Sequence, residues 1–293
     1  MKKNYGKILL SATLLATALS ACSNAKKAET SAVSSEKTTE ATSEKASETE
    51  KAKETEKAGE KEAVDLSSVK EETVYVSADY VKALLGSGKD VKVLEAAWGP
   101  VDADKDYNKA HIPGAFHVNT DDIEEEKTWN FRSPEEIEKL LKNYGITKDT
   151  IVVTYGNTPE NTADDRLAAV LLWAGVEDVK NLSGGIDAWV KAGFETEKQV
   201  NEPVATNEDF GVKIPAHPEY VLSIDEVKEK MKDDAKFKLV SIRSKDEFLG
   251  KTSGYSYIDR AGEPLGAVWG HDTDDGSYNN ADGTVVDLSL IHI

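Results

Sequence analysis

Few residues of this sequence have the chemistry of a nucleophile or a metal ligand. The 293 residues include one cysteine, Cys22, and five histidines. A single cysteine cannot form an intramolecular disulfide, and thiolate chemistry is excluded at every other position. His111 and His117 have no other ligand-type neighbours at metal spacing, so we predict no metal site and no cofactor.

Cys22 follows a segment that is typical of a secretion signal. Residues 1–21 combine a lysine-rich start with an apolar stretch over residues 8–19, which is shorter than the roughly 20 apolar residues of a membrane span. The tetrapeptide Leu-Ser-Ala-Cys that ends at Cys22 resembles a bacterial lipobox, which implies cleavage before the cysteine and lipidation of its sulfur. The alternative is an ordinary signal peptide with a chance cysteine. We expect an extracytoplasmic protein, anchored to the cell membrane by lipid on Cys22.

The residues after the signal do not have the composition of a folded domain. Residues 22–65 are mainly Ser, Thr, Glu, Lys and Ala and contain no aromatic residue. Such a segment cannot bury enough apolar surface to offset the entropy of ordering, so we expect a disordered tether. The formal net charge of −18 disfavours nucleic acid and anionic lipid as partners.

From residue 74 onward, segments typical of strands and of helices alternate. The expected strands are 74–76, 91–95, 151–155 and 179–182, and the expected helices are 78–85, 134–144, 164–174 and 186–192. Strands separated by helices predict right-handed crossovers and a mostly parallel sheet that is covered on both faces. We therefore predict an α/β domain over residues 66–198, with a parallel sheet flanked by helices.

Two motifs stand out in this region: an aromatic residue and His-Ile-Pro-Gly-Ala lead into a strand, and a Gly-Gly and Ala-Trp pair follows later. Their main residues are His111, Pro113, Gly114, Gly184, Gly185 and Trp189. Both motifs resemble those of the rhodanese (sulfurtransferase) family. The resemblance covers residues 74–195 and implies a rhodanese-like parallel sheet. Pro113 and Gly114 suit a tight turn before a strand. We interpret His111 as a structural residue that pins this turn, in preference to a catalytic role.

In the rhodanese family the nucleophile is a cysteine directly after the central strand, in a loop that cradles an anion before a helix. The resemblance places Gly156 at that position, so we predict an inactive loop with no catalytic residue. This active-site-like loop contains Gly156, Asn157, Thr158, Asn161 and Arg166. Asp164 and Asp165 near the helix start would repel an anion, and Thr162 with Asp165 fits a capping box. Binding of a cation or a neutral ligand is the alternative.

A second, incomplete set of the same motifs follows a proline-containing linker over residues 199–217. Residues 239–248 resemble the family's first strand, with Ser241 where an acid usually stands, and residues 262–270 resemble the Pro-Gly-Ala turn without the histidine. We therefore predict a tandem arrangement with a partial second domain over residues 218–287, in which Arg243 serves as an ion-pair partner. The uncharged tail, 288–293, breaks the pattern, and we interpret the chain as truncated in this second domain.

The resemblance implies thiosulfate-type sulfur transfer by the full-length parent protein, with a small sulfur-donor anion as a partner besides the membrane. For the printed residues we expect no persulfide turnover, because they lack the nucleophilic cysteine. The alternative is a non-catalytic rhodanese-fold module that binds or scaffolds at the cell surface. A phosphatase of the related cysteine-dependent fold would need a Cys-x5-Arg motif, which the sequence does not contain.

Overall fold

The structure of the protein is a computed structural model that describes residues 65–69, 74–157, 162–271 and 277–286. The expected signal peptide, Cys22 and the tail 288–293 lie outside these residues, as does the expected tether except for Asp65. Asp65 caps a short 3-10 helix, η1 (Leu66–Ser68). Among the described residues, no helix combines the length and the apolar character that crossing a membrane requires.

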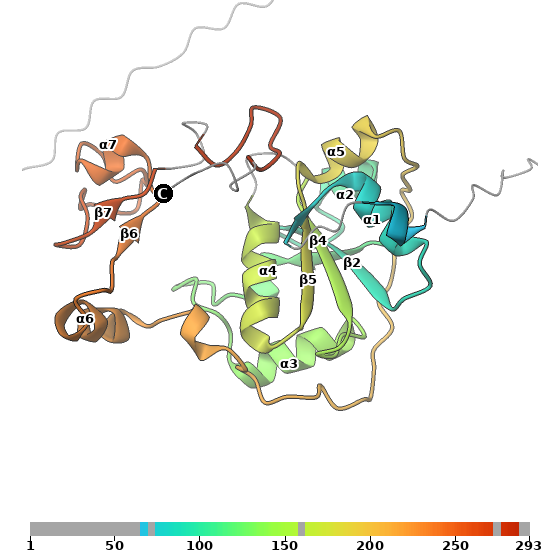
Figure 1. The fold of residues 1–293 in the computed structure, drawn as a ribbon, viewed down its shortest axis with the longest axis horizontal. Helices are drawn as coiled ribbons and strands as arrows, with labels where there is room; N and C mark the ends of the chain where they lie inside the picture. Colours follow the sequence, from blue (N-terminus) through green and yellow to red (C-terminus); the bar gives the residue numbers. More distant parts are fainter. Residues whose placement is uncertain (1–64, 70–73, 158–161, 272–276, 287–293) are drawn as a thin grey trace, which may run out of the picture. The chain divides into compact units, whose positions relative to one another are not determined.

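A five-stranded sheet forms the centre of the first domain (Figure 1). Its strands are β1 (Tyr75–Val76), β2 (Val91–Ala97), β3 (Phe116–Asn119), β4 (Ile151–Tyr155) and β5 (Asp178–Leu182). They lie in the order β1-β5-β4-β2-β3, and each neighbouring pair is parallel. The predicted α/β fold with a parallel sheet flanked by helices is therefore confirmed.

Helices connect the strands, and their starts follow capping signals in the sequence. They are α1 (Ala78–Leu85), α2 (Lys105–Lys109), α3 (Pro134–Asn143), α4 (Ala163–Ala174) and α5 (Gly185–Lys191), with the 3-10 turn η2 (Thr120–Asp122) after β3. Ser77 accepts a hydrogen bond from the Tyr80 amide at the start of α1, and Ser133 forms a capping box with Glu136 at the start of α3. The short helix α2 was not among the predicted helices, because its five residues carry no apolar period.

The two faces of the sheet bury two separate apolar clusters. Along β4, Val152 belongs to the cluster under α3 and α4, whereas Val153 belongs to the cluster under α1 and α5. The same alternation separates Leu94 from Val93 in β2. Successive strand residues point to opposite faces, so burial on both faces explains the nearly continuous apolar runs of these strands.

The predicted linker, 199–217, packs against the first domain although it contains no helix or strand. Phe210 and Ile214 are buried in the cluster under α3 and α4. The Lys148 amide donates to the Phe210 carbonyl at 2.9 Å, and the Thr206 amide donates to the Lys142 carbonyl at 2.9 Å. This segment therefore contributes to the core of the first domain.

The second module, residues 218–286, begins with the 3-10 turn η3 (Pro218–Tyr220). Its other elements are α6 (Ile224–Asp233), β6 (Val240–Ser241), α7 (Lys245–Phe248) and β7 (Val268–Trp269). The strands β6 and β7 pair in parallel, and β6 covers only two residues of the segment 239–248 that resembles the family's first strand. Arg243 contacts Glu247 at 2.9 Å and Glu263 at 3.2 Å, which confirms its predicted role as an ion-pair partner.

The second module repeats a register found in the first domain. Ser241 pairs with Trp269 across β6 and β7, as Glu95 pairs with His117 across β2 and β3. The strands β3 and β7 each follow a tight turn, which is closed by a hydrogen bond from the Ala115 amide and from the Ala267 amide, respectively.

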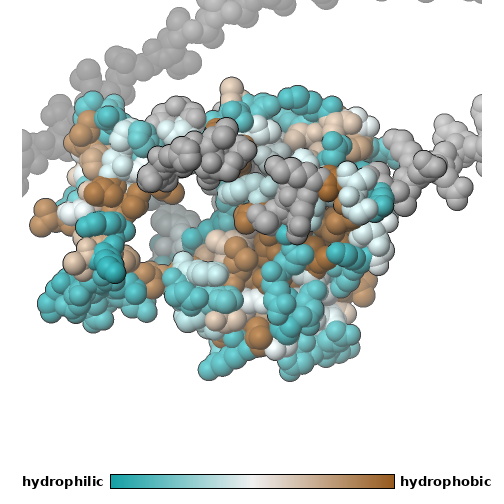
Figure 2. All heavy atoms as spheres, in the orientation of Figure 1, coloured by the Kyte–Doolittle hydropathy of each residue, from teal (hydrophilic) through white to brown (hydrophobic). Residues whose placement is uncertain are grey.

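Apolar side chains reach the surface of the second module (Figure 2). The most exposed of them is Leu265, at 97%.

Candidate functional site

The carboxyl ends of the parallel strands meet at one edge of the sheet, and polar residues gather there. Glu95 lies near the end of β2 and His117 lies in β3, while Gly156 and Asn157 directly follow β4. In open α/β sheets, ligands bind outside the carboxyl ends of the strands. This edge is therefore the candidate functional site of the first domain.

Gly156 lies directly after β4 and against the start of α5. The Ile186 amide donates to the Gly156 carbonyl at 3.1 Å. Gly185 has φ 55°, and a Cβ atom at that position would lie 2.3 Å from the Gly156 oxygen. The glycine pair Gly184–Gly185 therefore permits a close approach of two backbones. Gly156 has no side chain, so the first position after β4 offers no group that could carry sulfur.

Thr158 and Asn161, two residues of the predicted loop, lie outside the described residues. Arg166, the arginine of the predicted loop, lies in the second turn of α4 and contacts other parts of the chain. Its guanidinium pairs with Glu124 and donates to the Trp129 carbonyl at 2.5 Å. It also lies 4.4 Å from the centroid of the Phe131 ring. These contacts occupy the guanidinium with protein groups.

The first turn of α4 carries two carboxylates, Asp164 and Asp165, which face β1 and β5. Asn181 Nδ2 donates to both of them, at 3.0 and 3.1 Å, and the Tyr75 hydroxyl donates to Asp165 at 2.9 Å. Burial raises the pKa of Asp164 to about 6, and the charge of Asp165 adds to this effect. Carboxylates at this position oppose the binding of an anion.

The predicted capping box of α4 is wrong. Thr162 is the N-cap residue, but its side chain makes no capping hydrogen bond. The Asp165 side chain, which the box requires to reach back toward Thr162, instead accepts hydrogen bonds from Tyr75 and Asn181. Packing of α4 on the sheet thus directs this carboxylate to the strands, which sequence spacing alone does not show.

His111 is fully buried and holds the chain before β3. Its Nδ1 lies 2.8 Å from the Tyr107 carbonyl, which only accepts, so Nδ1 carries the proton. The imidazole stacks on the Tyr107 ring with 3.9 Å between the ring centroids. The backbone groups of His111 and Glu197 exchange two hydrogen bonds of 2.9 Å. All of these contacts are within the domain.

Pro113 and Gly114 form the centre of a tight turn. The Ala115 amide donates to the Ile112 carbonyl at 2.9 Å, and Gly114 has φ 80°. Proline followed by a residue with positive φ is the signature of a type II turn. Trp189, the tryptophan of the later Ala-Trp pair, is buried in α5.

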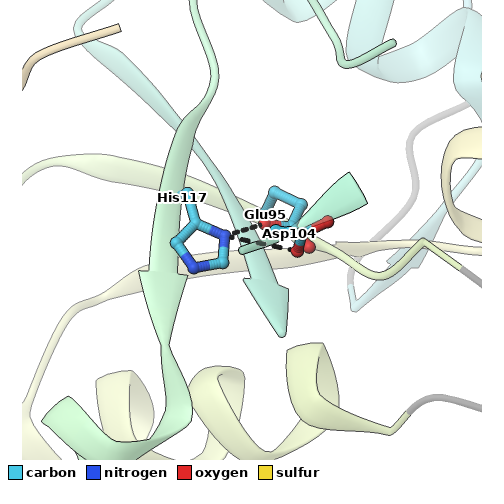
Figure 3. A group of neighbouring side chains, drawn as sticks. All are labelled: Glu95, Asp104 and His117. Atoms are coloured by element: carbon cyan, nitrogen blue, oxygen red, sulfur yellow. Dashed lines mark hydrogen bonds and ion pairs between the residues drawn. The ribbon is translucent and has the colours of Figure 1, made fainter. Parts of the chain in front are cut away.

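A second set of side chains at the same edge was missed by the sequence analysis. Glu95, Asp104 and His117 converge, with Asp104 coming from the N-cap of α2 (Figure 3). Nδ1 of His117 lies 2.5 Å from Oε2 of Glu95 and 3.6 Å from Oδ2 of Asp104. Asn157 Nδ2 donates to Oε1 of Glu95 at 2.6 Å.

His117 therefore does have ligand-type neighbours, contrary to the prediction from sequence spacing. The register that pairs Glu95 with His117 brings together residues 22 positions apart. The sequence did contain a signal, namely Glu95 near the end of one strand and His117 shortly after the Gly114 turn that leads into the next strand. Spacing along the chain does not reveal such a cluster, because its members meet across strands.

The buried pair Glu95–His117 has perturbed protonation. Burial raises the pKa of Glu95 to about 7; the hydrogen bond and charge of His117 oppose the rise, and the charges of Asp104 and Asp164 reinforce it. Burial lowers the pKa of His117, but its hydrogen bonds to Glu95 and Gly99 and the nearby carboxylates outweigh burial and raise it. Both groups therefore bind a proton more readily than they would in water.

Part of the chain matches a known family of domains. Residues 77–192 match the family model of the rhodanese-like domain. The chain is 41% identical over 226 residues to the thiosulfate sulfurtransferase YnjE of Escherichia coli strain K12, an alignment that covers 75% of this chain and 48% of that protein. It is 29% identical over 180 residues to a thiosulfate sulfurtransferase of Corynebacterium glutamicum, covering 60% of this chain and 56% of that protein.

A solved structure shows the same fold. The crystal structure of YnjE superposes with a TM-score of 0.66 and 38% sequence identity, covering 73% of this chain and 53% of that one. The chain thus spans about half the length of YnjE. Together with the parallel sheet and these relationships, the family match identifies residues 77–192 as a rhodanese-like domain.

Proposed function

We propose that the rhodanese-like domain of this chain is a non-catalytic unit of a thiosulfate-type sulfurtransferase. The observation that carries the proposal is Gly156, which directly follows β4. By resemblance to the rhodanese family, this is the position of the cysteine that carries sulfur. Sulfur transfer through an enzyme persulfide requires a thiolate. In this proposal the full-length protein carries that cysteine outside the printed residues.

The electrostatics of the loop support the same proposal. Asp164 and Asp165 stand at the start of α4, and the guanidinium of Arg166 is engaged by Glu124. A thiosulfate anion at Gly156 would approach carboxylates, whose repulsion works against the attraction of the helix N-terminus. The domain therefore serves as a scaffold for a catalytic part elsewhere.

The repeated register of the second module supports a tandem arrangement. Gly266 has φ 90° and the Ala267 amide donates to the Pro264 carbonyl at 3.1 Å, which repeats the turn at Gly114 in the first domain. We infer that residues 218–287 belong to a second copy of the fold, and that this copy is the place for the catalytic cysteine.

The test is a thiosulfate and cyanide assay that measures thiocyanate, on the printed chain and on its Cys22→Ser variant. We expect both proteins to remain at the level of the blank, and mass spectra to show no added sulfur atom. Turnover that is lost on Cys22→Ser would make Cys22 a sulfur carrier and would overturn the proposal. A full-length protein with no cysteine loop in its second copy would favour a binding module without catalysis.

We also propose that Cys22 carries a lipid that anchors the protein outside the cytoplasm. The support is the lipobox-like tetrapeptide and the aromatic-free segment that follows it. Each buried methylene of an acyl chain adds about 0.8 kcal/mol to membrane binding. We expect the chain in the membrane fraction and Cys22→Ser in the soluble fraction. Equal distribution of the two proteins would contradict the anchor.

A further inference from the structure

We propose that Glu95, Asp104 and His117 form a binding site for one divalent transition-metal ion of the zinc class, with Asn157 as a fourth ligand. One ligand atom from each of the first three residues lies within 4.8 Å of the others. Zinc binds nitrogen and oxygen ligands at about 2.0–2.2 Å, so two ligand atoms of a tetrahedral site lie about 3.4 Å apart. Nδ1 of His117 is 3.6 Å from Oδ2 of Asp104, close to that spacing, and it would move about 1 Å away from Oε2 of Glu95, which is now at 2.5 Å. This inference does not depend on the proposed sulfur transfer.

The histidine has the orientation that metal sites use. Nε2 of His117 lies 2.8 Å from the Gly99 carbonyl oxygen, which can only accept, so Nε2 carries a proton. A backbone carbonyl on the far ring nitrogen fixes the tautomer and orients a metal-binding imidazole. Nδ1 therefore faces the two carboxylates (Figure 3), and the ion would replace the proton that now joins Nδ1 to Glu95.

Each carboxylate directs an oxygen toward His117. Oδ1 of Asp104 caps α2 by accepting from the amides of Asp106 and Tyr107, both at 2.9 Å, which leaves Oδ2 facing the imidazole. Glu95 is fully buried and directs Oε2 to the same nitrogen. Two carboxylates around one imidazole attract a divalent cation strongly in a buried position.

Asn157 supplies an independent observation. The residue is 8% exposed, and its amide group lies against both carboxylates, 2.6 Å from Glu95 and 3.5 Å from Asp104. Its Oδ1 is buried and has no hydrogen-bond partner among the described residues. A half-turn about the last side-chain bond exchanges the nitrogen and the oxygen. A bound cation would favour the orientation in which Oδ1 of Asn157 faces the two carboxylates, and this oxygen would then be a ligand of the ion.

The second module offers a comparison within the same chain. At the strand register that holds Glu95 and His117, it has Ser241 and Trp269. An indole has no lone pair for a metal, and a neutral hydroxyl is not among zinc's usual protein ligands. We therefore expect one ion per chain, bound in the first domain.

The test is calorimetric titration of the metal-free chain, prepared with a chelator, using Zn²⁺ as the probe. Asp104→Asn keeps an oxygen for capping α2 but removes the ligand charge, and His117→Gln removes the nitrogen ligand. The matched controls lie outside the site: Asp102→Asn changes an exposed aspartate, and His217→Gln changes a histidine whose side chain is 45% exposed. We expect one ion per wild-type chain, at least about tenfold weaker binding in the two site variants, and unchanged binding in the controls.

Co²⁺ gives a second readout that does not depend on stability. Its visible absorption is stronger in a four-coordinate site than in water, so the wild-type chain should gain a band that His117→Gln reduces. Circular dichroism of each metal-free variant shows whether it is folded. The proposal is overturned if the folded wild-type chain binds no stoichiometric Zn²⁺, or if the site variants bind as tightly as the controls.

Discussion

His117 and Glu95 face each other in register across β2 and β3, with 2.5 Å between Nδ1 and Oε2. Both side chains are buried at the carboxyl edge of the sheet, where Gly156 and Asn157 follow β4. This one contact connects the fold to the site, because the strand register that builds the sheet also pairs the two groups. The contribution of this contact to the free energy of unfolding can be measured by mutation.

Replacing His117 by alanine leaves the Glu95 carboxyl without its imidazole partner. Breaking a buried charged pair typically costs about 3–5 kcal/mol. We expect a loss of at least about 2 kcal/mol in the free energy of unfolding, since Glu95 can lower the cost by binding a proton. Urea unfolding with a chelator present measures it. His217→Ala removes a histidine whose side chain is 45% exposed and should lower the free energy of unfolding by less than about 1 kcal/mol. Equal losses for the two variants would show that the buried pair contributes no more than a surface contact.

Gly185→Ala tests the close approach of α5 to the end of β4. A Cβ atom there would lie 2.3 Å from the backbone oxygen of Gly156, so the backbone must shift. We expect a loss of more than about 2 kcal/mol in unfolding free energy. Gly193→Ala is the matched control, because Gly193 also has positive φ but has no atom within 4 Å of its added Cβ. It should lose only about 1 kcal/mol, from backbone strain alone.

Asp164 makes stability depend on pH in a defined direction. Burial raises the pKa of Asp164 to about 6, so the folded chain holds this proton more tightly than the unfolded chain. Stability from this group therefore falls as pH rises from about 4 to about 6, by at most about 3 kcal/mol, and stays level above.

Asp164→Asn removes that titration while keeping an oxygen that can accept from Asn181. Relative to wild type, we expect the variant to gain stability between about pH 4 and about pH 7.5, and the exposed control Asp102→Asn to show no such trend. Chemical unfolding at about pH 4 and at about pH 7.5 measures the difference in unfolding free energy between each variant and wild type. A difference between Asp164→Asn and wild type that is the same at both pH values would refute the raised pKa.

Phe210→Ala tests whether residues 199–217 belong to the core of the first domain. Phe210 is 1% exposed in the cluster under α3 and α4, and its removal should cost about 3–5 kcal/mol. Val204→Ala changes a residue of the same segment that is 81% exposed and should cost little. A simple linker would give small losses for both variants, measured by thermal or urea unfolding.

The sequence by itself determined four strands and four helices of the first domain and the absence of a cysteine directly after β4. The alternation of apolar strands with capped helices predicted β4 and α4 to within one residue, because periodicity and capping are local properties. Gly156 could be located for the same reason, since the end of an apolar strand can be read directly from the chain. The turn at Pro113 and Gly114 was equally local.

Only the tertiary structure decided which polar side chains meet at the site. Glu95 and Asn157 are 62 positions apart, yet they form a hydrogen bond of 2.6 Å because β2 and β4 are neighbours in the sheet. Strand order and packing likewise turned Asp165 from a predicted cap into a partner of Tyr75. Contacts between distant residues depend on strand order and register, and those are settled by burial of the whole sheet rather than by any local pattern.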